Sequence, residues 1–577
     1  MGSDRQNIID TDNQELQNAL QIIQYTNHSL FLTGKAGTGK STFLRHLANN
    51  TKKKHVVLAP TGIAAISAGW STLHSFFKLP FYPLLPNDTQ FNARNIRKTL
   101  KYNQEKIKML RELDLIIIDE ISMVRADIID FIDKVLRIYC QNMRTPFGGK
   151  QLLLVGDMFQ LEPVVTDDEK VLLRQFYPNS LFFNAHVFRE MRLVSIELKK
   201  VYRQNDAEFI SLLDNIRTSC VTAFDMQRLN QRVGKPTDSD GMSITLSTRR
   251  DTVDYINQAR LAQLDGDIAV YEGVITGEFP ESSLPSPKRL ELKLGAQILF
   301  VRNDKDHQWV NGTLGMVTGF DMHKGTEKIQ IHTDRGDDVE VEREVWSNTR
   351  YTFNETEKKI EEEEIGTYTQ FPLKLAWAIT VHKSQGLTFK NVNIDFSGGA
   401  FAGGQTYVAL SRCQTLEGIC LQEPIRRSDI FVKPEVRDFA TSYNDKSLIN
   451  NALKQSQADK YYNDAAKAFD RGDMQAALAS LFIAIHSRYD IEKPAPRRLL
   501  RMKLNIVNTL RREVESLRNT IAQREGTLKR FASEYVSMGK MCEREGMRDA
   551  AIRNYKKALE LCPDHQEAKR RLKKLKK

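Results

Sequence analysis

The chain has 577 residues, a net charge of +11 at pH 7 and a pI near 9.1. Its hydrophobic content of 41% and charged content of 27% are ordinary for a soluble globular protein, and its length provides for about three to five domains. No apolar stretch approaches the roughly 20 residues of a membrane span, so we expect no membrane partner. The basic balance permits nucleic-acid binding, but many soluble basic proteins share it.

The six cysteines form no C-x-x-C pair, which argues against a zinc site and against a disulfide framework. Thiols of this kind are typical of a reducing compartment, and the N-terminal segment lacks the apolar core of a signal peptide. We therefore expect a cytoplasmic protein of the bacterial cytosol or nucleoid, with a nuclear location left open.

Residues 1–190 are predicted to form a first α/β core, because short apolar runs alternate there with helical patterns, as in a parallel sheet. Within this core the amino-acid composition changes at about residues 78–110, where Pro80, Pro83 and Pro86 occur among scattered asparagines. That change indicates a small insertion on the surface of the first sheet. The predicted strands are Ser29–Thr33, Val56–Ala59, Leu115–Asp119 and Leu152–Gly156.

Residues 191–440 repeat the alternation and predict a second core. At about residues 295–365 it is interrupted by apolar–polar alternation with Gly and Asp turns, which indicates a small inserted β-barrel. The acidic run EKKIEEEEIG at residues 357–366 is interpreted as a solvated linker. The predicted strands of the core are Ser243–Ser247, Ala376–Val381, Asn391–Asp395 and Gly418–Leu421.

Residues 441–577 are predicted to be all helical, because the composition shifts to Ala, Arg, Leu and Lys without strand signals. Small residues and a tyrosine occur at the positions where tetratricopeptide repeats bring two helices close together. A weaker copy surrounds Gly472, at a spacing that is not a whole number of repeats, so a generic helical bundle remains an alternative. The repeat-like positions are Gly539, Gly546, Ala551, Tyr555, Ala558 and Pro563.

The segment GKAGTGKS, residues 34–41, matches the phosphate-binding loop G-x-x-x-x-G-K-[ST] between a predicted strand and a predicted helix. The glycines let backbone N–H groups close around phosphate oxygens, Lys40 brings positive charge to the β- and γ-phosphates, and Ser41 binds Mg²⁺. We therefore expect ATP and Mg²⁺ as cofactors. The predicted nucleotide-binding residues here are Gly34, Ala36, Gly37, Thr38, Gly39, Lys40, Ser41 and Thr42.

Asp119 and Glu120 come directly after an apolar run. Asp119 can reach the metal through water, and Glu120 can orient or deprotonate the water that attacks the phosphate. Taken alone, such a pair is often only a capped strand; together with the phosphate loop it predicts a hydrolytic site.

In QLLLVGDMFQLEP, residues 151–163, a buried strand stops in Gly156, Asp157 and Gln160. In open α/β sheets, ligands bind at the edge where the strands end. If this strand lies beside the one that ends at Asp119, Gln160 comes near the γ-phosphate. Its neutral amide could then distinguish ATP from ADP, although a turn-forming glutamine is the simpler alternative.

With these motifs, the chain resembles the superfamily 1 helicases over about residues 14–425. DEISM and GDMFQLEPV resemble motifs II and III, and other segments follow in the family's order: APTGIAA (59–65), TLHSFF (72–77), VYRQ (201–204), VHKSQGLTF (381–389) and YVALSRC (407–413). The segment from Phe131 to Asp157 is similar to a signature of the PIF-like (petite-integration-frequency) DNA helicases. The resemblance implies two RecA-like P-loop NTPase cores with an SH3-like barrel, followed here by the tetratricopeptide-like domain.

The resemblance also assigns roles to single residues. Gln17 takes the place of an adenine-reading glutamine, Gly386 lies near the nucleotide, and Arg203 and Arg412 match arginines that reach across the cleft to the γ-phosphate. Such arginines stabilise the charge spread over the phosphoryl oxygens. The predicted catalytic set is Lys40, Asp119, Glu120, Gln160, Arg203 and Arg412, with Ser41 and Asp119 at the metal.

A DNA-binding set follows from the same resemblance. Hydroxyls, small residues and a lysine contact phosphates, while aromatic rings stack on bases. Taken alone, His74 and Phe76 would more often be core residues; Trp70 and Phe77 are undecided, and Pro80–Pro86 is a candidate strand-separating wedge. The predicted residues are Pro60, Thr61, Gly62, His74, Ser75, Phe76, Thr248, His382, Lys383 and Ser384.

The function that the resemblance implies is an ATP-dependent 5′–3′ DNA helicase of the 1B class, acting on single-stranded DNA and DNA forks. We expect a monomer, although the sequence does not decide the oligomeric state. G-quadruplexes and RNA–DNA hybrids are further candidate substrates. The alternative is a DNA translocase or remodeller with little duplex unwinding, recruited to its site by an unknown protein partner through the C-terminal helices.

Overall fold

The computed structural model describes residue 10 and residues 12–575, apart from 63–64, 66–69, 81, 203–205, 237–241, 307, 324–325, 355–358, 398 and 489–493. The chain divides into two compact units, Met1–Asp459 and Lys460–Lys577. Within the described residues, no helix is long and apolar enough to cross a bilayer.

The first core is built on a six-stranded parallel sheet in the order β3-β2-β4-β5-β1-β6. The four predicted strands are confirmed to within one residue at each end. Two strands were not predicted, and one of them, β6, pairs with β1, so the first core extends past the predicted boundary at residue 190. The strands are β1 (Leu30–Gly34), β2 (His55–Ala59), β3 (Ser71–Thr72), β4 (Leu115–Ile118), β5 (Gln151–Val155) and β6 (Val194–Leu198).

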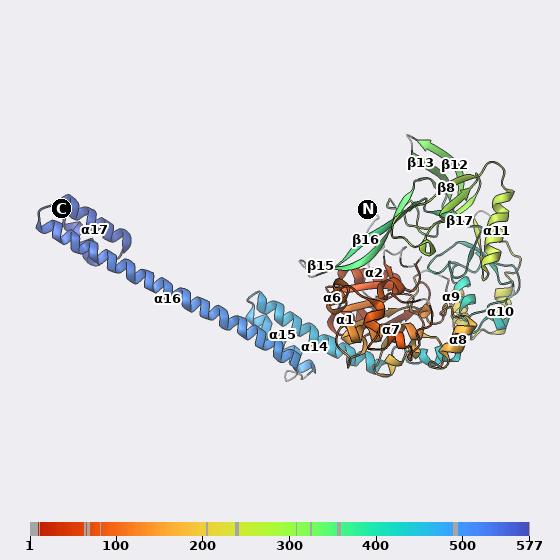
Figure 1. The fold of residues 1–577 in the computed structure, drawn as a ribbon, viewed down its shortest axis with the longest axis horizontal. Helices are drawn as coiled ribbons and strands as arrows, with labels where there is room; N and C mark the ends of the chain where they lie inside the picture. Colours follow the sequence, from red (N-terminus) through yellow and green to blue (C-terminus); the bar gives the residue numbers. More distant parts are fainter. Residues whose placement is uncertain are drawn as a thin grey trace. The chain divides into compact units, whose positions relative to one another are not determined.

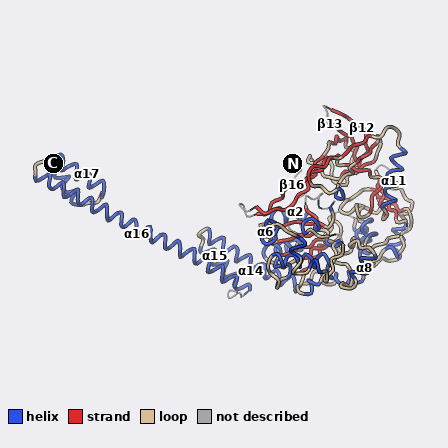
Figure 2. The backbone as a smooth tube through the Cα atoms, in the orientation of Figure 1, coloured by secondary structure: helices blue, strands red, loops and turns tan. Residues whose placement is uncertain are grey.

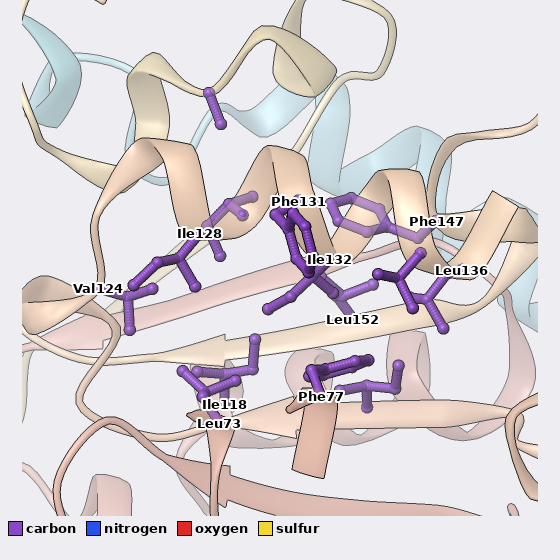
Figure 3. Packing of buried hydrophobic residues seen from close by; sticks show 14 of the residues in the cluster. Leu73, Phe77, Ile118, Val124, Ile128, Phe131, Ile132, Leu136, Phe147 and Leu152 are labelled. Carbon is purple, nitrogen blue, oxygen red and sulfur yellow. The ribbon is translucent and has the colours of Figure 1, made fainter. Parts of the chain in front are cut away.

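Helices cover both faces of this sheet. On one face, α7 carries Ile128, Ile132 and Leu136 at four-residue spacing, and Figure 3 shows them directed towards Ile118 of β4 and Leu152 of β5. This spacing places the three side chains on one stripe of the helix. The helices of this core are α1 (Gln14–Tyr25), α2 (Lys40–Asn50), α4 (Leu73–Phe77), α5 (Ile96–Leu100), α6 (Gln104–Glu112), α7 (Ala126–Tyr139) and α8 (Asp167–Leu173).

The segment at residues 78–110 was predicted to be an insertion on the surface of the first sheet. In the structure, part of it is buried. Leu84, Phe91, Ile96 and Leu100 are buried in the same hydrophobic cluster as α7, because their apolar side chains continue the core of the first sheet. Tyr82 is exposed, and the wedge role of this segment stays a prediction.

The second core contains a four-stranded parallel sheet in the order β18-β7-β19-β20. Its predicted strands are confirmed, although the strand predicted from Ala376 to Val381 is shorter in the structure and covers only Ala378–Thr380. The strands are β7 (Ser243–Ser247), β18 (Ala378–Thr380), β19 (Asn391–Asp395) and β20 (Ile419–Leu421); the helices are α9 (Ala207–Arg217), α10 (Ala223–Asn230), α11 (Arg250–Gln263) and α12 (Gln405–Leu410). The next helix, α13 (Pro434–Ala440), packs instead against the hydrophobic cluster of the first core through Val436.

The inserted β-region consists of a five-stranded antiparallel sheet, β14-β13-β12-β11-β17, with two smaller sheets, β10-β8 and β15-β16-β9 (Figure 1). Ile298, Phe300, Ile331 and Phe371 lie in its core. The strands are β8 (Ala269–Glu272), β9 (Val274–Gly277), β10 (Arg289–Leu292), β11 (Gln297–Phe300), β12 (Leu314–His323), β13 (Thr326–Thr333), β14 (Asp338–Val341), β15 (Glu344–Asn354), β16 (Lys359–Gln370) and β17 (Leu373–Leu375).

The interpretation of the acidic run as a linker is wrong, because most of it lies in β16, which forms a long antiparallel hairpin with β15. Opposite charges across the hairpin stabilise this pairing: Arg350 and Glu363 are cross-strand partners, 2.9 Å apart. The hairpin also contacts the first core. The hydroxyl of Tyr351 accepts a hydrogen bond of 3.3 Å from the backbone N–H of Val57.

The C-terminal unit is helical, as predicted (Figure 2). Gly472 and Gly546 adopt the left-handed conformation at turns that follow α14 and α16, and Gly539 lies against the buried ring of Tyr555. The close helix contact expected of a tetratricopeptide-like pair is therefore present; the repeat class itself stays a prediction. The helices are α15 (Met474–Arg488), α16 (Pro494–Arg544), α17 (Arg548–Leu561), α18 (Gln566–Leu575) and the second half of α14 (Lys446–Asp470), whose first half belongs to the first unit.

Candidate functional site

The phosphate loop joins the end of β1 to the start of α2. Gly37 and Gly39 adopt left-handed φ angles of 80° and 83°, and Gly39 caps α2 without a side-chain hydrogen bond. The N–H groups of the first helical turn are therefore left for a ligand, and the helix dipole favours an anion there. A Cβ on Gly34 would lie 2.7 Å from Thr38 Oγ1, which explains the first glycine of the motif.

Lys40 folds back over the loop. Its ammonium donates hydrogen bonds of 2.6 Å to the carbonyl of Gly34 and 2.9 Å to that of Lys35. Burial lowers the pKa of Lys40, while Asp157 and Glu120 oppose that shift. The positive charge thus lies where a phosphate bound by the loop would neutralise it.

Asp119 and Glu120 follow β4 and face the same space. Burial raises the pKa of Asp119 to about 6 and that of Glu120 to about 7, and the neighbouring Asp119 carboxylate adds to the shift of Glu120. Glu120 has a positive φ of 49°, an unfavourable conformation for a residue with a side chain. Such strain is concentrated at functional sites.

Gln160 lies at the end of the loop after β5, the strand next to β4, as the sequence analysis proposed. It is buried, and its amide lies 3.4 Å from Asp157 Oδ2. The second core contacts this loop closely: a Cβ on Gly404, at the start of α12, would lie 2.3 Å from the carbonyl oxygen of Gln160.

One cavity of about 460 Å³ joins these groups to residues of the second core. Arg412 is 2% exposed, and its guanidinium is held by the carbonyls of Val408, Ser384 and Leu387. Gly386, with φ of 83°, completes the wall from the second core. Of the predicted residues, the cavity is lined by Ala36, Gly37, Thr38, Gly39, Lys40, Ser41, Thr42, Asp119, Glu120, Gln160, Gly386 and Arg412.

The remaining predicted nucleotide residues are not placed on the wall of this cavity. Gly34 ends β1 beneath the loop, where its carbonyl accepts the hydrogen bond from Lys40. Gln17 is exposed on α1, and its neighbour Leu16 lines the wall instead, because the helix turns the Gln17 side chain towards solvent. Arg203 lies outside the described residues.

Sequence reasoning missed several residues that connect the two cores. The backbone N–H of Ala36, in the phosphate loop, donates to the hydroxyl of Tyr407 at 3.0 Å. The guanidinium of Arg217 donates to Asp157 at 2.9 Å, with both side chains buried. Tyr407 belongs to the quoted segment YVALSRC, so its motif was recognised but not its role; Arg217 carries no local signal.

Tyr202 and Asp10, which were also missed, line the same cavity. Tyr202 is half exposed, its ring lies beside Gly39, and its hydroxyl donates to Asp10 at 2.7 Å. A partly exposed aromatic ring next to a phosphate loop offers a face on which a base could stack. The segment VYRQ contains Tyr202, which was the available signal.

The residues present fit a magnesium nucleotide. Among the described residues, no group of three or more His, Cys, Asp or Glu could hold a metal ion. Mg²⁺ is usually held by one or two protein oxygens together with phosphate oxygens and water, and Ser41 and Asp119 supply such oxygens in the same cavity as the phosphate loop.

A second cavity of about 540 Å³ adjoins the first, and Glu120 lines both. Thr61 of the first core and His382 and Lys383 of the second, three of the residues predicted to bind DNA, line it. Lys374, which was not predicted, adds another positive charge; burial and the neighbouring Lys383 lower its pKa to about 8. The cavity thus brings hydroxyl and basic groups from both cores together.

The other predicted DNA-binding residues do not line this cavity. Phe76 and Phe77 are buried in the first core, so neither ring presents a face for stacking on a base. Ser384 is fully buried and its hydroxyl donates to the carbonyl of Val381. The remainder lie elsewhere: Pro60 and Gly62 are half-buried, Thr248 is buried, His74 is half-buried, Ser75 is exposed and Trp70 contacts the hydrophobic cluster beneath α1 and α2.

The fold and the site define a class of protein: a two-core P-loop NTPase whose nucleotide cleft is lined by both cores. A profile of the PIF1-like helicase family matches residues 9–226, and one of the Pif1 2B domain matches residues 281–320. The chain is 31% identical over 431 residues to the ATP-dependent DNA helicase Pif1 of Bdellovibrio bacteriovorus, with 74% of this chain and 90% of the relative covered. The chain belongs to the PIF1-like helicase family.

Further relatives extend the comparison. The ATP-dependent DNA helicase PIF1 of Rattus norvegicus is 34% identical over 420 residues, and the match covers 70% of this chain but only 60% of the rat protein. A crystal structure of Bacteroides sp Pif1 in complex with ADP-AlF4 is 41% identical and covers 74% of this chain and 96% of its own, with a TM-score of 0.67. Bacteroides Pif1 bound to ssDNA is 42% identical, covers 76% and 98%, and has a TM-score of 0.55.

Proposed function

We propose that the protein is an ATP-dependent DNA helicase that moves along single-stranded DNA and separates duplex at forks. The observation that carries this proposal is the placement of Lys40 and Arg412, from two different cores, in one cavity. A nucleotide that contacts both cores stabilises their closed arrangement, and hydrolysis removes the interactions with the γ-phosphate. ATP turnover thus becomes a relative movement of the cores.

In the hydrolytic step, Glu120 orients and deprotonates the attacking water, while Lys40 and Arg412 stabilise the charge on the phosphoryl oxygens. Ser41 and Asp119 would hold Mg²⁺, which would supply positive charge to neutralise the phosphates. Gln160 contacts the γ-phosphate, and its backbone lies against Gly404 of the second core. Loss of the γ-phosphate thus changes a residue that the second core contacts.

The second cavity is the proposed contact surface for single-stranded DNA. Lys374, Lys383 and Thr61 supply charge and a hydroxyl for phosphates. Glu120 lines this cavity as well as the nucleotide cleft. The bound DNA strand and the hydrolytic site are therefore in contact with the same side chain. The Bacteroides relatives crystallised with ssDNA and with ADP-AlF4 support both assignments.

Lys40→Ala tests the nucleotide site. ATP turnover should be lost while single-strand binding, measured by fluorescence anisotropy, stays close to that of the unaltered chain. Substantial turnover in this variant would refute the assignment of the phosphate loop.

The 5′–3′ direction, and action on G-quadruplexes or RNA–DNA hybrids, are extensions from the family resemblance. Unwinding of duplexes with a 5′ tail against duplexes with a 3′ tail tests direction and unwinding together. Unwinding of neither substrate, with ATP turnover stimulated by single strands, would favour the translocase alternative instead.

We also propose a location in the bacterial cytosol or nucleoid, with a nuclear location left open. The six cysteines are free thiols, which is typical of a reducing compartment. A protein partner of the C-terminal helices stays a prediction.

A further inference from the structure

The middle of α16 has no partner among the described residues of its unit. Its N-terminal part contacts α14, where Lys503 forms an ion pair with Asp470, and its C-terminal part packs against α17 and α18 through Ala532 and Val536. Between them, all 28 residues from 504 to 531 are exposed. Most of the stability of a helix in a protein comes from packing of its apolar face, and this segment has no such packing within the single chain.

The uncovered segment carries a strict heptad pattern. From 507 to 531, the large apolar side chains fall only at alternating spacings of three and four residues, and seven of the eight positions in this series are apolar. Each of these seven side chains is 39–62% exposed. They are Val507, Leu510, Val514, Leu517, Ile521, Leu528 and Phe531.

This pattern is the seam of a coiled coil, over about three and a half heptads, which meets the usual length for such an assignment. With Val507 at position a, the a positions hold Val, Val, Ile and Leu, and the d positions begin with Leu510 and Leu517. β-Branched residues at a combined with leucine at d favour a parallel two-stranded coiled coil.

We infer that the chain forms a homodimer through α16, as a parallel, in-register coiled coil over residues 507–531. This differs from the monomer expected in the sequence analysis. The occupant is a second copy because the segment complements itself. Glu513 at position g meets Arg518 at position e of the second copy, twice per dimer, and opposite charges at g and e set partner and orientation.

The one polar residue in the seam is compatible with this arrangement. Arg524 occupies a d position, and Glu525 follows at e. In a parallel dimer a d side chain lies beside the e position of the partner helix, so Arg524 of each copy can pair with Glu525 of the other. A polar residue at a single core position also fixes the register, at a cost in stability.

The dimer does not depend on the proposed helicase activity, because the seam lies wholly within the C-terminal unit. The test is the molar mass of the full chain by light scattering after size exclusion. The unaltered chain should have about twice its mass of 66.2 kDa at micromolar concentration. Leu517→Glu/Ile521→Glu should be monomeric, because two charges per chain would enter the seam.

The matched control is Asn519→Glu/Gln523→Glu, which adds the same charges at outward positions f and c and should remain dimeric. Circular dichroism of the control should match that of the unaltered chain. Any loss of helix in the monomeric variant should be confined to residues 504–531, as located by hydrogen exchange, because the two substituted side chains are exposed in the single chain. A monomeric unaltered chain, a trimeric mass, or a dimer that survives Leu517→Glu/Ile521→Glu would overturn the proposal.

Orientation is tested by cross-linking. Ile521→Cys should form a disulfide dimer under mild oxidation, because equivalent a positions face each other in a parallel coiled coil, within the Cα separation that a disulfide spans. Gln523→Cys, and the unaltered chain with its natural cysteines, give the background. In an antiparallel pair Ile521 would face Leu517, so cross-linking only in a mixture of Ile521→Cys and Leu517→Cys would overturn the parallel arrangement.

Discussion

Gln385 of the second core donates a hydrogen bond of 2.8 Å to the carboxylate of Glu120 in the first. The same amide group lies 3.4 Å from Oε1 of Gln160. Gln385 also lines the second cavity beside His382 and Lys383. One side chain therefore contacts the group proposed to activate water, the group proposed to detect the γ-phosphate, and the surface proposed to bind DNA.

Gln385→Ala should lower the rate of ATP hydrolysis stimulated by single-stranded DNA about 10-fold, because a hydrogen bond to a charged group contributes roughly 1.5–3 kcal/mol. The KM for ATP should change little, since Gln385 is not among the residues of the phosphate loop. Gln414→Ala, at an exposed position of the same core, is the control. Steady-state kinetics with and without DNA give the comparison; an unchanged maximal rate would mean that the contact has no role in hydrolysis.

A buried ion pair joins the cores at a second point. Arg217 donates to Asp157 through two nitrogens, at 2.9 and 3.2 Å, and also to Glu197 at 3.1 Å. Asp157→Ala leaves the guanidinium buried without this carboxylate, and removing one partner of a buried pair typically costs about 3–5 kcal/mol.

The expected result is a lower unfolding temperature by calorimetry. Asp254→Ala breaks the exposed pair with Arg250 and should cost less than about 1 kcal/mol. Equal effects of the two substitutions would contradict the assignment of Asp157 as a structural contact between the cores.

The parts of the site that sequence reasoning found are those with local signals. The phosphate loop, Asp119 and Glu120 each follow a short apolar strand, and parallel strands bring such ends to one edge. Gln160 was placed by the same argument, and its strand does lie next to that of Asp119. The role of Arg412 could be predicted only from the family resemblance, because its local sequence does not distinguish it from a surface arginine.

Other features depend on distant partners. The acidic run forms a strand because it pairs with β15, where residues such as Arg350 lie opposite its glutamates. These partners are too far away in the sequence for the local pattern of the run to indicate them. Phe76 was assigned to DNA, but its ring lies 6.0 Å from that of Tyr351 on the hairpin, a contact that covers it. The heptad of α16 was readable from spacing alone, but its meaning required the finding that nothing else among the described residues of the unit covers it.

Charge in the second cavity leads to a prediction on DNA affinity. The slope of log affinity against log salt changes by about 0.7 for each phosphate of single-stranded DNA that a protein neutralises. Lys374→Ala and Lys383→Ala should each make the slope shallower by about that amount, whereas Lys235→Ala, at an exposed position outside the cavity, should not. Equal slopes in all three variants would place the DNA elsewhere.

The same cavity should make DNA binding depend on pH. The pKa of Lys374 is lowered to about 8, so this lysine loses its positive charge as the pH rises through 8, and binding to phosphate weakens. Affinity at constant ionic strength should therefore fall between about pH 7 and pH 9 in the unaltered chain. Lys374→Ala should show a weaker dependence over this range, and an identical profile would contradict the role of Lys374.

Two glycines of α16 differ in what surrounds them. A Cβ on Gly539 would lie 2.6 Å from the ring of Tyr555, which is fully buried, whereas a Cβ on Gly526 would meet nothing within 4 Å. Overpacking typically costs about 1–3 kcal/mol, and replacing an exposed helical glycine by alanine gains about 0.5–1 kcal/mol. Gly539→Ala should therefore accelerate hydrogen exchange in α17, and Gly526→Ala should slow it in the middle of α16. Because Gly526 lies at an outward position of the heptad, its substitution leaves the proposed dimer seam intact. Slower exchange in α17 of Gly539→Ala would mean that α16 and α17 do not approach as closely as the structure places them.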